Sequence, residues 1–411
     1  MTAKQTNKLK ILNDPIYGFI TIPNSLIFDL IEHPYFQRLR RVSQMGLSYM
    51  VYPGAHHTRF QHAIGCMHLM QKAVRVLRFK GVYISDDEEN AVYIAILLHD
   101  IGHGAFSHAL ENSIVTGISH ESISLKFMEA LNEEFEGKLS LAITIFKGDY
   151  QRNFLHQLIS SQLDMDRLDY LKRDSFFTGV SEGNINSERL ITMLNVKDGN
   201  LVVEEKGIYS VEKFIVSRRL MYWQVYLHKT GLVAENILVK ILKRAKELVQ
   251  EGRTIEASKP LKYFLENPVD ETNFNSNTLE IFSRLDDFDV LLAIKEWVDF
   301  DDRILSELCK MLINRKLFKI EIQKEKFDSH KVEIVKKQIQ NDCNLTDKEV
   351  DYFFISNSVT NQAYNSIKNQ IKILDKSGNL KDLAKSTDNL NLEALSVPVI
   401  KYFLCYPKTS F

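Results

Sequence analysis

The stretch from residue 85 to residue 104 constrains the fold of this chain more than any other. The motif Ser85-x-x-Glu88 has the spacing of a capping box, which predicts a helix start at this point. The apolar run Ala91–Leu98 predicts that the helix continues to about Leu98 and lies in the protein interior. His99-Asp100 and a glycine-containing turn follow, so the sequence places two ligand-type side chains where a buried helix ends.

Helical periodicity continues through most of the chain, with apolar residues three and four positions apart. A long amphipathic helix is expected from Arg59 to Phe79. Alternation around turn formers at 11–23 predicts a β-hairpin arm, and the segments 201–203 and 208–210 predict a small internal hairpin. We therefore expect an all-α fold class with a short N-terminal hairpin arm, one internal hairpin and a helical C-terminal region.

The length of 411 residues exceeds what one hydrophobic core usually supports, so an appended or second domain is expected. The polar run 266–278 is the best linker candidate. It predicts a core at 1–265, including the arm, and a helical assembly or regulatory region at 266–411. The alternative is that this run only connects elements within one fold.

Charge and cysteine content limit the classes of partner and compartment. A formal net charge of -1 argues against a globally basic nucleic-acid coat, although a local basic site remains open. The four cysteines are far apart, without a CxxC pair, and no apolar run is long enough to span a bilayer. We therefore expect a cytoplasmic protein that does not bind a membrane.

Eight of the twelve histidines fall between positions 56 and 120, so chemistry is sought there. His62 lies on the helix before His99-Asp100, and Asp166 lies on one after it. Two imidazoles and two carboxylates suit a divalent metal ion (Mn²⁺, Fe²⁺, Zn²⁺ or Mg²⁺) with open coordination positions for water and substrate. The alternative for a histidine at a helix end is a simple hydrogen-bonding role. Arg59 shares a helix face with His62, and its planar guanidinium suits phosphate oxygens.

The order and wide spacing of His62, His99-Asp100 and Asp166 resemble the HD-domain phosphohydrolase superfamily. Six ordered motifs between about Ile11 and Lys229 are similar to those of its deoxynucleoside triphosphate triphosphohydrolase branch. These motifs are Asn13-Asp14-Pro15-Ile16-Tyr17-Gly18, Phe36-Gln37-Arg38-Leu39-Arg40, Tyr52-Pro53-Gly54-Ala55, Thr58-Arg59-Phe60-Gln61-His62, the stretch from His99 to His108, and Asp166-Arg167-Leu168-Asp169-Tyr170. The resemblance implies an HD-domain helical core.

The same resemblance assigns roles around the metal. It implies that the ligands are His62, His99, Asp100 and Asp166. It implies a catalytic row of His103, His108, Glu111 and His120. A histidine near the 5′ oxygen can protonate the departing alkoxide, which is otherwise a poor leaving group. We take His120 as the first choice for this acid and His103 as the second. The alternative for His120 is a helix-cap residue beside Glu121.

Substrate contacts are implied by the resemblance in the same way. Tyr170 and Asp174 follow Asp166 at four and eight positions, so they continue a helical stripe from the metal site. The tyrosine is expected to pack under the deoxyribose and exclude a 2′-hydroxyl, and the aspartate to bond the 3′-hydroxyl. For Arg218 and Tyr226 the alternative is helix packing. The expected substrate-binding set is Gln44, Arg59, Tyr170, Asp174, Arg218, Tyr226 and Lys229.

A regulatory site between subunits is also implied, because nucleotide-activated members of the branch bind a second nucleotide there. The matching positions are Asn13, Gln37, Arg40, Arg315 and Lys319. Cations from separate segments can clamp a triphosphate and so tie assembly into a dimer or tetramer to nucleotide level. The alternative is that these Lys- and Arg-rich stretches are solvated helix faces.

The activity that these inferences favour is metal-dependent hydrolysis of a dNTP to the deoxynucleoside and inorganic triphosphate. We expect dGTP as the first substrate and other dNTPs as the second. One alternative is a phosphodiesterase or nucleotidase that acts on another phosphate ester at the same generic site. The other is a nucleic-acid-binding protein with a vestigial site, which the neutral charge does not favour.

Overall fold

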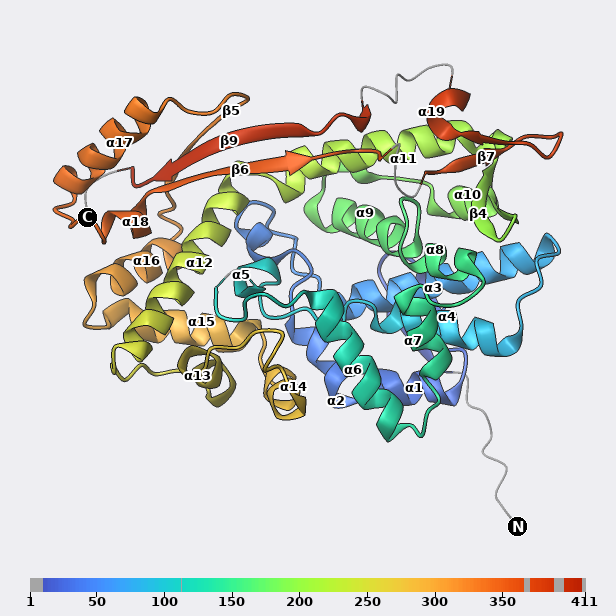
Figure 1. Ribbon diagram of the computed structural model, residues 1–411, viewed down its shortest axis with the longest axis horizontal. Helices are drawn as coiled ribbons and strands as arrows, with labels where there is room; N and C mark the ends of the chain where they lie inside the picture. Colours follow the sequence, from blue (N-terminus) through green and yellow to red (C-terminus); the bar gives the residue numbers. More distant parts are fainter. Residues whose placement is uncertain (1–9, 112, 366–369, 388–394, 409–411) are drawn as a thin grey trace, which may run out of the picture.

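The computed structural model describes residues 10–111, 113–365, 370–387 and 395–408, and it is mostly helical (Figure 1). The principal helices are α1 (Ser25–Glu32), α2 (Pro34–Gln37), α3 (Arg59–Phe79), α4 (Asp86–Leu98), α5 (His108–Glu111), α6 (His120–Glu134), α7 (Ser140–Lys147), α8 (Asn153–Ile159), α9 (Met165–Thr178), α10 (Ser187–Thr192), α11 (Ile208–Met221), α12 (Lys229–Gln250), α13 (Lys259–Glu266), α14 (Ser276–Phe282), α15 (Asp287–Glu296), α16 (Arg303–Ile313), α17 (Ser329–Asp342), α18 (Val350–Phe353) and α19 (Leu383–Ser386). The strands are β1 (Ile11–Asp14), β2 (Gly18–Thr21), β3 (Leu194–Lys197), β4 (Asn200–Glu204), β5 (Lys319–Gln323), β6 (Ile355–Asn361), β7 (Lys372–Leu374), β8 (Leu380–Asp382) and β9 (Val399–Tyr406). The prediction of a mostly helical protein with an N-terminal hairpin is confirmed.

Helices α3 and α4 pack against each other, and both begin at capping boxes. Thr58 and Gln61 form the box of α3, and Ser85 and Glu88 form that of α4. All residues from Ala91 to Leu98 are buried, as the apolar run predicts. The two helices therefore begin and end where the sequence indicates, and α4 delivers His99-Asp100 to the interior.

The internal hairpin lies earlier in the chain than predicted. Its strands are β3 and β4, joined at Asp198 and Gly199, whose φ angles are 52° and 73°. Two consecutive positive φ values are typical of the type I′ turn that an Asp-Gly pair favours, and this signal was missed. The segment 208–210, expected as the second strand, begins helix α11 instead. That placement was wrong.

The C-terminal region was predicted to be helical, but beyond Ile313 it mixes the helices α17, α18 and α19 with five strands. Beyond that residue, β5, β9 and β6 form an antiparallel sheet, visible as the long strands at the top of Figure 1. The sequence of β9 is rich in β-branched and aromatic residues, which fit a pleated surface. Strand β7 pairs in parallel with β4, so late chain segments complete the sheet of the internal hairpin.

The polar run 266–278 connects elements that pack on the same core. Within it, Val269 forms a β-bridge with Val115, and the amide of Thr116 donates to the Val269 carbonyl at 3.3 Å. One cluster of buried apolar side chains extends from Ile20 to Cys405. The boundary between 1–265 and 266–411 therefore stays a prediction, with extensive packing across it. Within the described segments, no helix is both long and apolar enough to cross a membrane.

Candidate functional site

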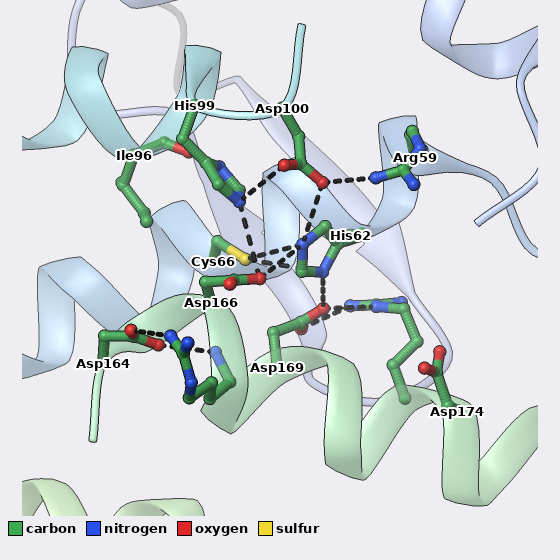
Figure 2. A network of polar contacts seen from close by, with 12 residues as sticks. Arg59, His62, Cys66, Ile96, His99, Asp100, Asp164, Asp166, Asp169 and Asp174 are labelled. Atoms are coloured by element: carbon green, nitrogen blue, oxygen red, sulfur yellow. Dashed lines mark hydrogen bonds and ion pairs between the residues drawn. The ribbon is translucent and has the colours of Figure 1, made fainter. Parts of the chain in front are cut away.

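Three helices bring His62, His99, Asp100 and Asp166 together (Figure 2). His62 lies in the first turn of α3, His99-Asp100 follows α4, and Asp166 lies in the first turn of α9. The Oδ1 atom of Asp166 is 3.1 Å from Nε2 of His62 and 3.5 Å from Nε2 of His99. Asp100 contacts the same two nitrogens at 3.7 and 3.4 Å. The four residues predicted as metal ligands are therefore neighbours in space.

The hydrogen bonds of the two histidines leave Nε2 of each directed at the carboxylates. Nδ1 of His62 donates to Asp169 Oδ2 at 2.8 Å, and Nδ1 of His99 donates to the Ile96 carbonyl at 2.7 Å. A histidine that donates from Nδ1 offers its Nε2 lone pair to a metal. Nε2 of His99 is buried and makes no hydrogen bond. This donor set of two nitrogens and nearby carboxylate oxygens fits a divalent metal ion.

A buried network of charged side chains, Asp169, Arg173 and Asp14, supports His62 through its Nδ1 atom. Arg173 donates to Asp169 at 2.8 and 3.0 Å and to Asp14 at 2.8 Å, and the Arg173 side chain is completely buried. Burial raises the pKa of Asp169, but Arg173 and His62 outweigh that effect and lower it to about 2. Asp169 is therefore ionised and fixes the tautomer of His62. The motif Asp166-Arg167-Leu168-Asp169-Tyr170 contains this residue, but its spacing did not identify Asp169 as the partner of His62.

Close packing at Gly65 makes room for that network. A Cβ atom at Gly65 would lie 2.1 Å from Oδ1 of Asp169 and 2.3 Å from Nη2 of Arg173. Cys66, the next residue, places Sγ 3.5 Å from Nδ1 of His62, and burial raises the pKa of its thiol. Neither residue was expected in the site.

Asp100 also contacts Arg59. Arg59 donates from Nη1 to Oδ2 of Asp100 and from Nη2 to Oγ of Ser107 at 2.7 Å. Arg59 therefore contacts the cluster of predicted ligands (His62, His99, Asp100 and Asp166), called the metal cluster below, as its position before His62 predicts.

Asp166 is ionised within this cluster. Burial raises the pKa of Asp166, but His62 and His99 outweigh this effect and hold the pKa well below its usual range.

The predicted catalytic row adjoins Asp100. The rings of His103 and His120 stack with centroids 3.9 Å apart, and Nε2 of His103 is 3.5 Å from Oδ1 of Asp100. Nδ1 of His120 is 3.2 Å from Oε1 of Glu111. Burial, followed by the charge of Arg59, lowers the pKa of His103 to about 3. The side chain of His108 lies outside the described parts of the chain, so its predicted role is not tested.

A cavity of about 380 Å³ opens beside Arg59. This volume lies in the range of small-molecule sites. Tyr170 and Asp174 line it from α9, one and two turns after Asp166. The cavity lining contains five of the seven predicted substrate-binding residues, namely Gln44, Arg59, Tyr170, Asp174 and Tyr226.

Asp174 is held by two groups, one of which the sequence did not indicate. Nε2 of His57 lies 2.7 Å from Oδ1, and the Tyr226 hydroxyl donates to Oδ2 at 2.7 Å. The His57 ring stacks on Phe177 with centroids 4.4 Å apart. His57 had no assigned chemistry, and no local spacing signals its contact with a residue 117 positions away.

Two predicted substrate contacts lie outside the cavity lining. Arg218 donates to the Ala363 carbonyl at 3.5 Å, and its Nε is buried without a hydrogen bond. Lys229 is exposed at the start of α12. Their roles remain predictions.

The predicted regulatory residues are partly brought together within one chain. Nε of Arg40 donates to Oε1 of Gln37 at 2.9 Å. Arg315 donates to the Met50 carbonyl at 2.9 Å, Lys319 contacts Glu321 and Tyr406, and Asn13 pairs with Phe19 in the hairpin. A site between subunits needs a second chain, so this prediction is not tested.

Family models match two consecutive parts of the chain. The model described as the HD domain matches residues 59–174, which hold all four candidate ligands. The model described as the HD associated region matches residues 185–263.

Several known proteins are similar to the chain. A crystal structure of a phosphohydrolase from Bacteroides thetaiotaomicron has a TM-score of 0.94 and 51% identity, covering 98% of this chain and 100% of that one. The uncharacterized protein YwfO of Bacillus subtilis is 37% identical over 75% of this chain and 71% of its own length. The deoxynucleoside triphosphate triphosphohydrolase SAMHD1 homolog of Dictyostelium discoideum is 30% identical, over 61% of this chain and 52% of its own length. The chain thus spans about half of this last relative.

Proposed function

Because the chain belongs to the HD-domain phosphohydrolases, with the HD-associated region that follows the domain, we propose that it hydrolyses deoxynucleoside triphosphates, dGTP in particular. The products are the deoxynucleoside and inorganic triphosphate. The more general statement, that the protein is a metal-dependent phosphohydrolase, rests on its family and on the His/Asp cluster.

The observation that carries the proposal is the stripe of α9 that joins the metal cluster to the cavity. Asp166 lies at the cluster, while Tyr170 and Asp174 line the cavity one and two turns later. A substrate whose α-phosphate lies at the cluster therefore has its sugar beside these two side chains. A relative named as a deoxynucleoside triphosphate triphosphohydrolase supports this choice of substrate.

Hydrolysis breaks the bond between the α-phosphorus and the 5′ oxygen as water attacks phosphorus. A divalent metal bound by His62, His99, Asp100 and Asp166 would activate water and neutralise charge on the phosphoryl group. His120, oriented through Nδ1 by Glu111, donates a proton to the 5′ oxygen as it leaves. Arg59 releases its contact with Asp100 and binds phosphate oxygens of the substrate instead.

Recognition of the sugar belongs to the cavity. Tyr170 packs under the deoxyribose and leaves no room for a 2′-hydroxyl, whereas Asp174 accepts a hydrogen bond from the 3′-hydroxyl. His57 and Tyr226 already hold the two oxygens of Asp174 in place. This arrangement favours deoxynucleotides over ribonucleotides.

The test is a product assay with each dNTP alone and in pairs, with Mn²⁺ or Mg²⁺. We expect inorganic triphosphate and the deoxynucleoside in equal amounts, and no product from the Asp166→Ala variant. Release of pyrophosphate or monophosphate would show instead a different phosphate-ester hydrolase. Absence of dNTP turnover, with strong single-stranded DNA binding that survives Asp100→Ala, would favour the nucleic-acid-binding alternative.

The paired reactions also test regulation. A nucleotide site between subunits is supported if one dNTP accelerates the hydrolysis of another. Light scattering should then also show a shift from a smaller species to a dimer or tetramer. Arg40→Ala should then remove the acceleration without removing basal turnover.

A further inference from the structure

The first residue of α15 contacts two separate segments beside the cavity. Oδ2 of Asp287 accepts a hydrogen bond from the Ser43 amide at 2.8 Å, and Oδ1 accepts one from the Phe106 amide at 2.8 Å. Ser43 directly precedes the cavity-lining segment 44–48, and Phe106 also lines the cavity. Asp287 is only 4% exposed, so one buried carboxylate joins both segments.

The second of these segments has an unusual backbone. Phe106 and Ser107 have φ values of 49° and 48°, in the left-handed region that residues with side chains rarely adopt. Such a conformation persists when its surroundings hold it. Here Asp287 binds the Phe106 amide, and Arg59 binds the Ser107 hydroxyl at 2.7 Å.

Neighbouring Leu285 is connected to the same loop through Arg38. Its carbonyl accepts from Nη1 of Arg38 at 3.2 Å. Nη2 of Arg38 donates to the carbonyls of Ile101 and His103 at 2.7 and 2.9 Å, and Arg38 is completely buried. The start of α15 is therefore connected to the loop at both 101–103 and 106.

Capping of α15 does not explain the position of Asp287. The helix is capped by Asp286, whose side chain accepts from the Phe288 amide, while Asp289 accepts from the Asp286 amide at 2.8 Å. Both carboxylate oxygens of Asp287 are instead used outside the helix.

We propose that Asp287 is a positioning residue that sets the separation of segments 43–48 and 106–109, and thereby the fit of the nucleoside in the cavity. The role in substrate fit rests on the proposed function, whereas the role in holding the two segments does not. Asp287 itself does not line the cavity, so it acts through the backbone that it binds.

Hydrogen exchange tests the structural part of this proposal without any substrate. In Asp287→Asn, an amide group replaces one acceptor oxygen, so one of the two backbone donors loses its partner. At least one of the peptides covering 43–48 and 104–109 should then exchange at least about tenfold faster, while a peptide from the middle of α3 is unchanged. Asp289→Asn is the matched control, since it alters the same helical turn and its carboxylate accepts from the Asp286 amide rather than from Ser43 or Phe106. Unchanged exchange of both segments in Asp287→Asn, or equal acceleration in Asp289→Asn, would overturn the proposal.

Kinetics test the role in substrate fit. For the dNTP that the wild type hydrolyses best, Asp287→Asn should raise KM about tenfold and change kcat less than about threefold, which corresponds to lost binding. Mn²⁺ affinity should stay within about twofold of wild type. A KM within twofold of wild type would show that Asp287 does not set the fit. Should Asp287→Asn not fold, Asp287→Ser, which is smaller and admits water, carries the same expectations. If the wild type hydrolyses no dNTP, the proposed function fails, and the exchange experiment still decides the structural part.

Discussion

His62 and Asp169 share a hydrogen bond of 2.8 Å between Nδ1 and Oδ2, and both side chains are completely buried. Arg173 binds the same carboxylate, which therefore remains ionised beside the imidazole. The pair fixes which nitrogen of His62 faces the metal cluster. The support for this ligand thus comes from α9, in which Asp169 and Arg173 lie one helical turn apart.

Replacement of this supporting carboxylate should weaken metal binding without removing a ligand. We expect Asp169→Asn to lower Mn²⁺ affinity about 10- to 100-fold, because the neutral amide no longer fixes the tautomer of His62. Titration followed by electron paramagnetic resonance measures the effect, and Asp166→Ala, which removes a ligand, should bind less metal still. Wild-type affinity in Asp169→Asn would show that Asp169 does not support the ligand.

Gly65 should tolerate no side chain. In Gly65→Ala the new methyl group would overlap Asp169 and Arg173, so we expect a loss of about 3 kcal/mol in the free energy of unfolding. The matched control is Gly231→Ala in α12, where a Cβ atom meets nothing within 4 Å and stability should be unchanged or higher. Urea unfolding compares the two, and equal midpoints would contradict the close packing at Gly65.

His120 should be needed for turnover and not for metal. We expect His120→Ala to bind Mn²⁺ as the wild type does and to lower kcat about 100- to 10,000-fold, because the 5′ oxygen then leaves without its proton donor. Glu111→Gln should lower kcat less, since the imidazole stays in place. Near-wild-type turnover by His120→Ala would show that His120 is not the proton donor and would favour His103, the second choice.

Tyr170 should decide between deoxyribose and ribose. Its removal in Tyr170→Ala opens space where the 2′-hydroxyl would lie, so kcat/KM for GTP should rise relative to dGTP by about tenfold. Tyr209→Ala, at an exposed position on α11, serves as the control and should leave the ratio unchanged. An unchanged ratio in Tyr170→Ala would mean that other residues exclude the hydroxyl.

His68 should make the protein less stable in mild acid. Burial, aided by Lys72 and Arg75, lowers the pKa of His68 to about 4, and its Nε2 is buried without a hydrogen bond. The unfolded chain, in which a histidine has a pKa of about 6.5, therefore binds more protons between pH 4 and pH 6.5. This contribution to stability is fully present above about pH 6.5 and is lost as the pH falls toward 4.

The test compares unfolding midpoints of His68→Leu and wild type across this pH range. The variant should lose stability less steeply with falling pH, and the exposed His330→Gln should behave as the wild type does. Parallel curves for all three proteins would exclude His68 as a source of acid sensitivity.

Local sequence determined the elements that carry the metal cluster. The capping boxes and apolar periodicity of α3 and α4 depend only on residues a few positions apart, so both helices were predicted with their observed bounds. The order and spacing of His62, His99-Asp100 and Asp166 indicated the ligand candidates, because they resemble those of the HD-domain family. Short-range information was weaker for the strands, where the Asp198-Gly199 turn was overlooked and β9 pairs with segments distant in sequence.

Tertiary structure alone decided which side chains support those ligands. His57 with Asp174, Arg173 with Asp14, and Asp287 with the amides of Ser43 and Phe106 are contacts across more than 100 positions. Nothing in local spacing predicts them, because a buried carboxylate or cation takes whichever donor or acceptor the packing of other elements presents. The sequence by itself therefore determined the chemistry at the centre of the site, whereas the fold determined what holds that chemistry in place and which cavity lies beside it.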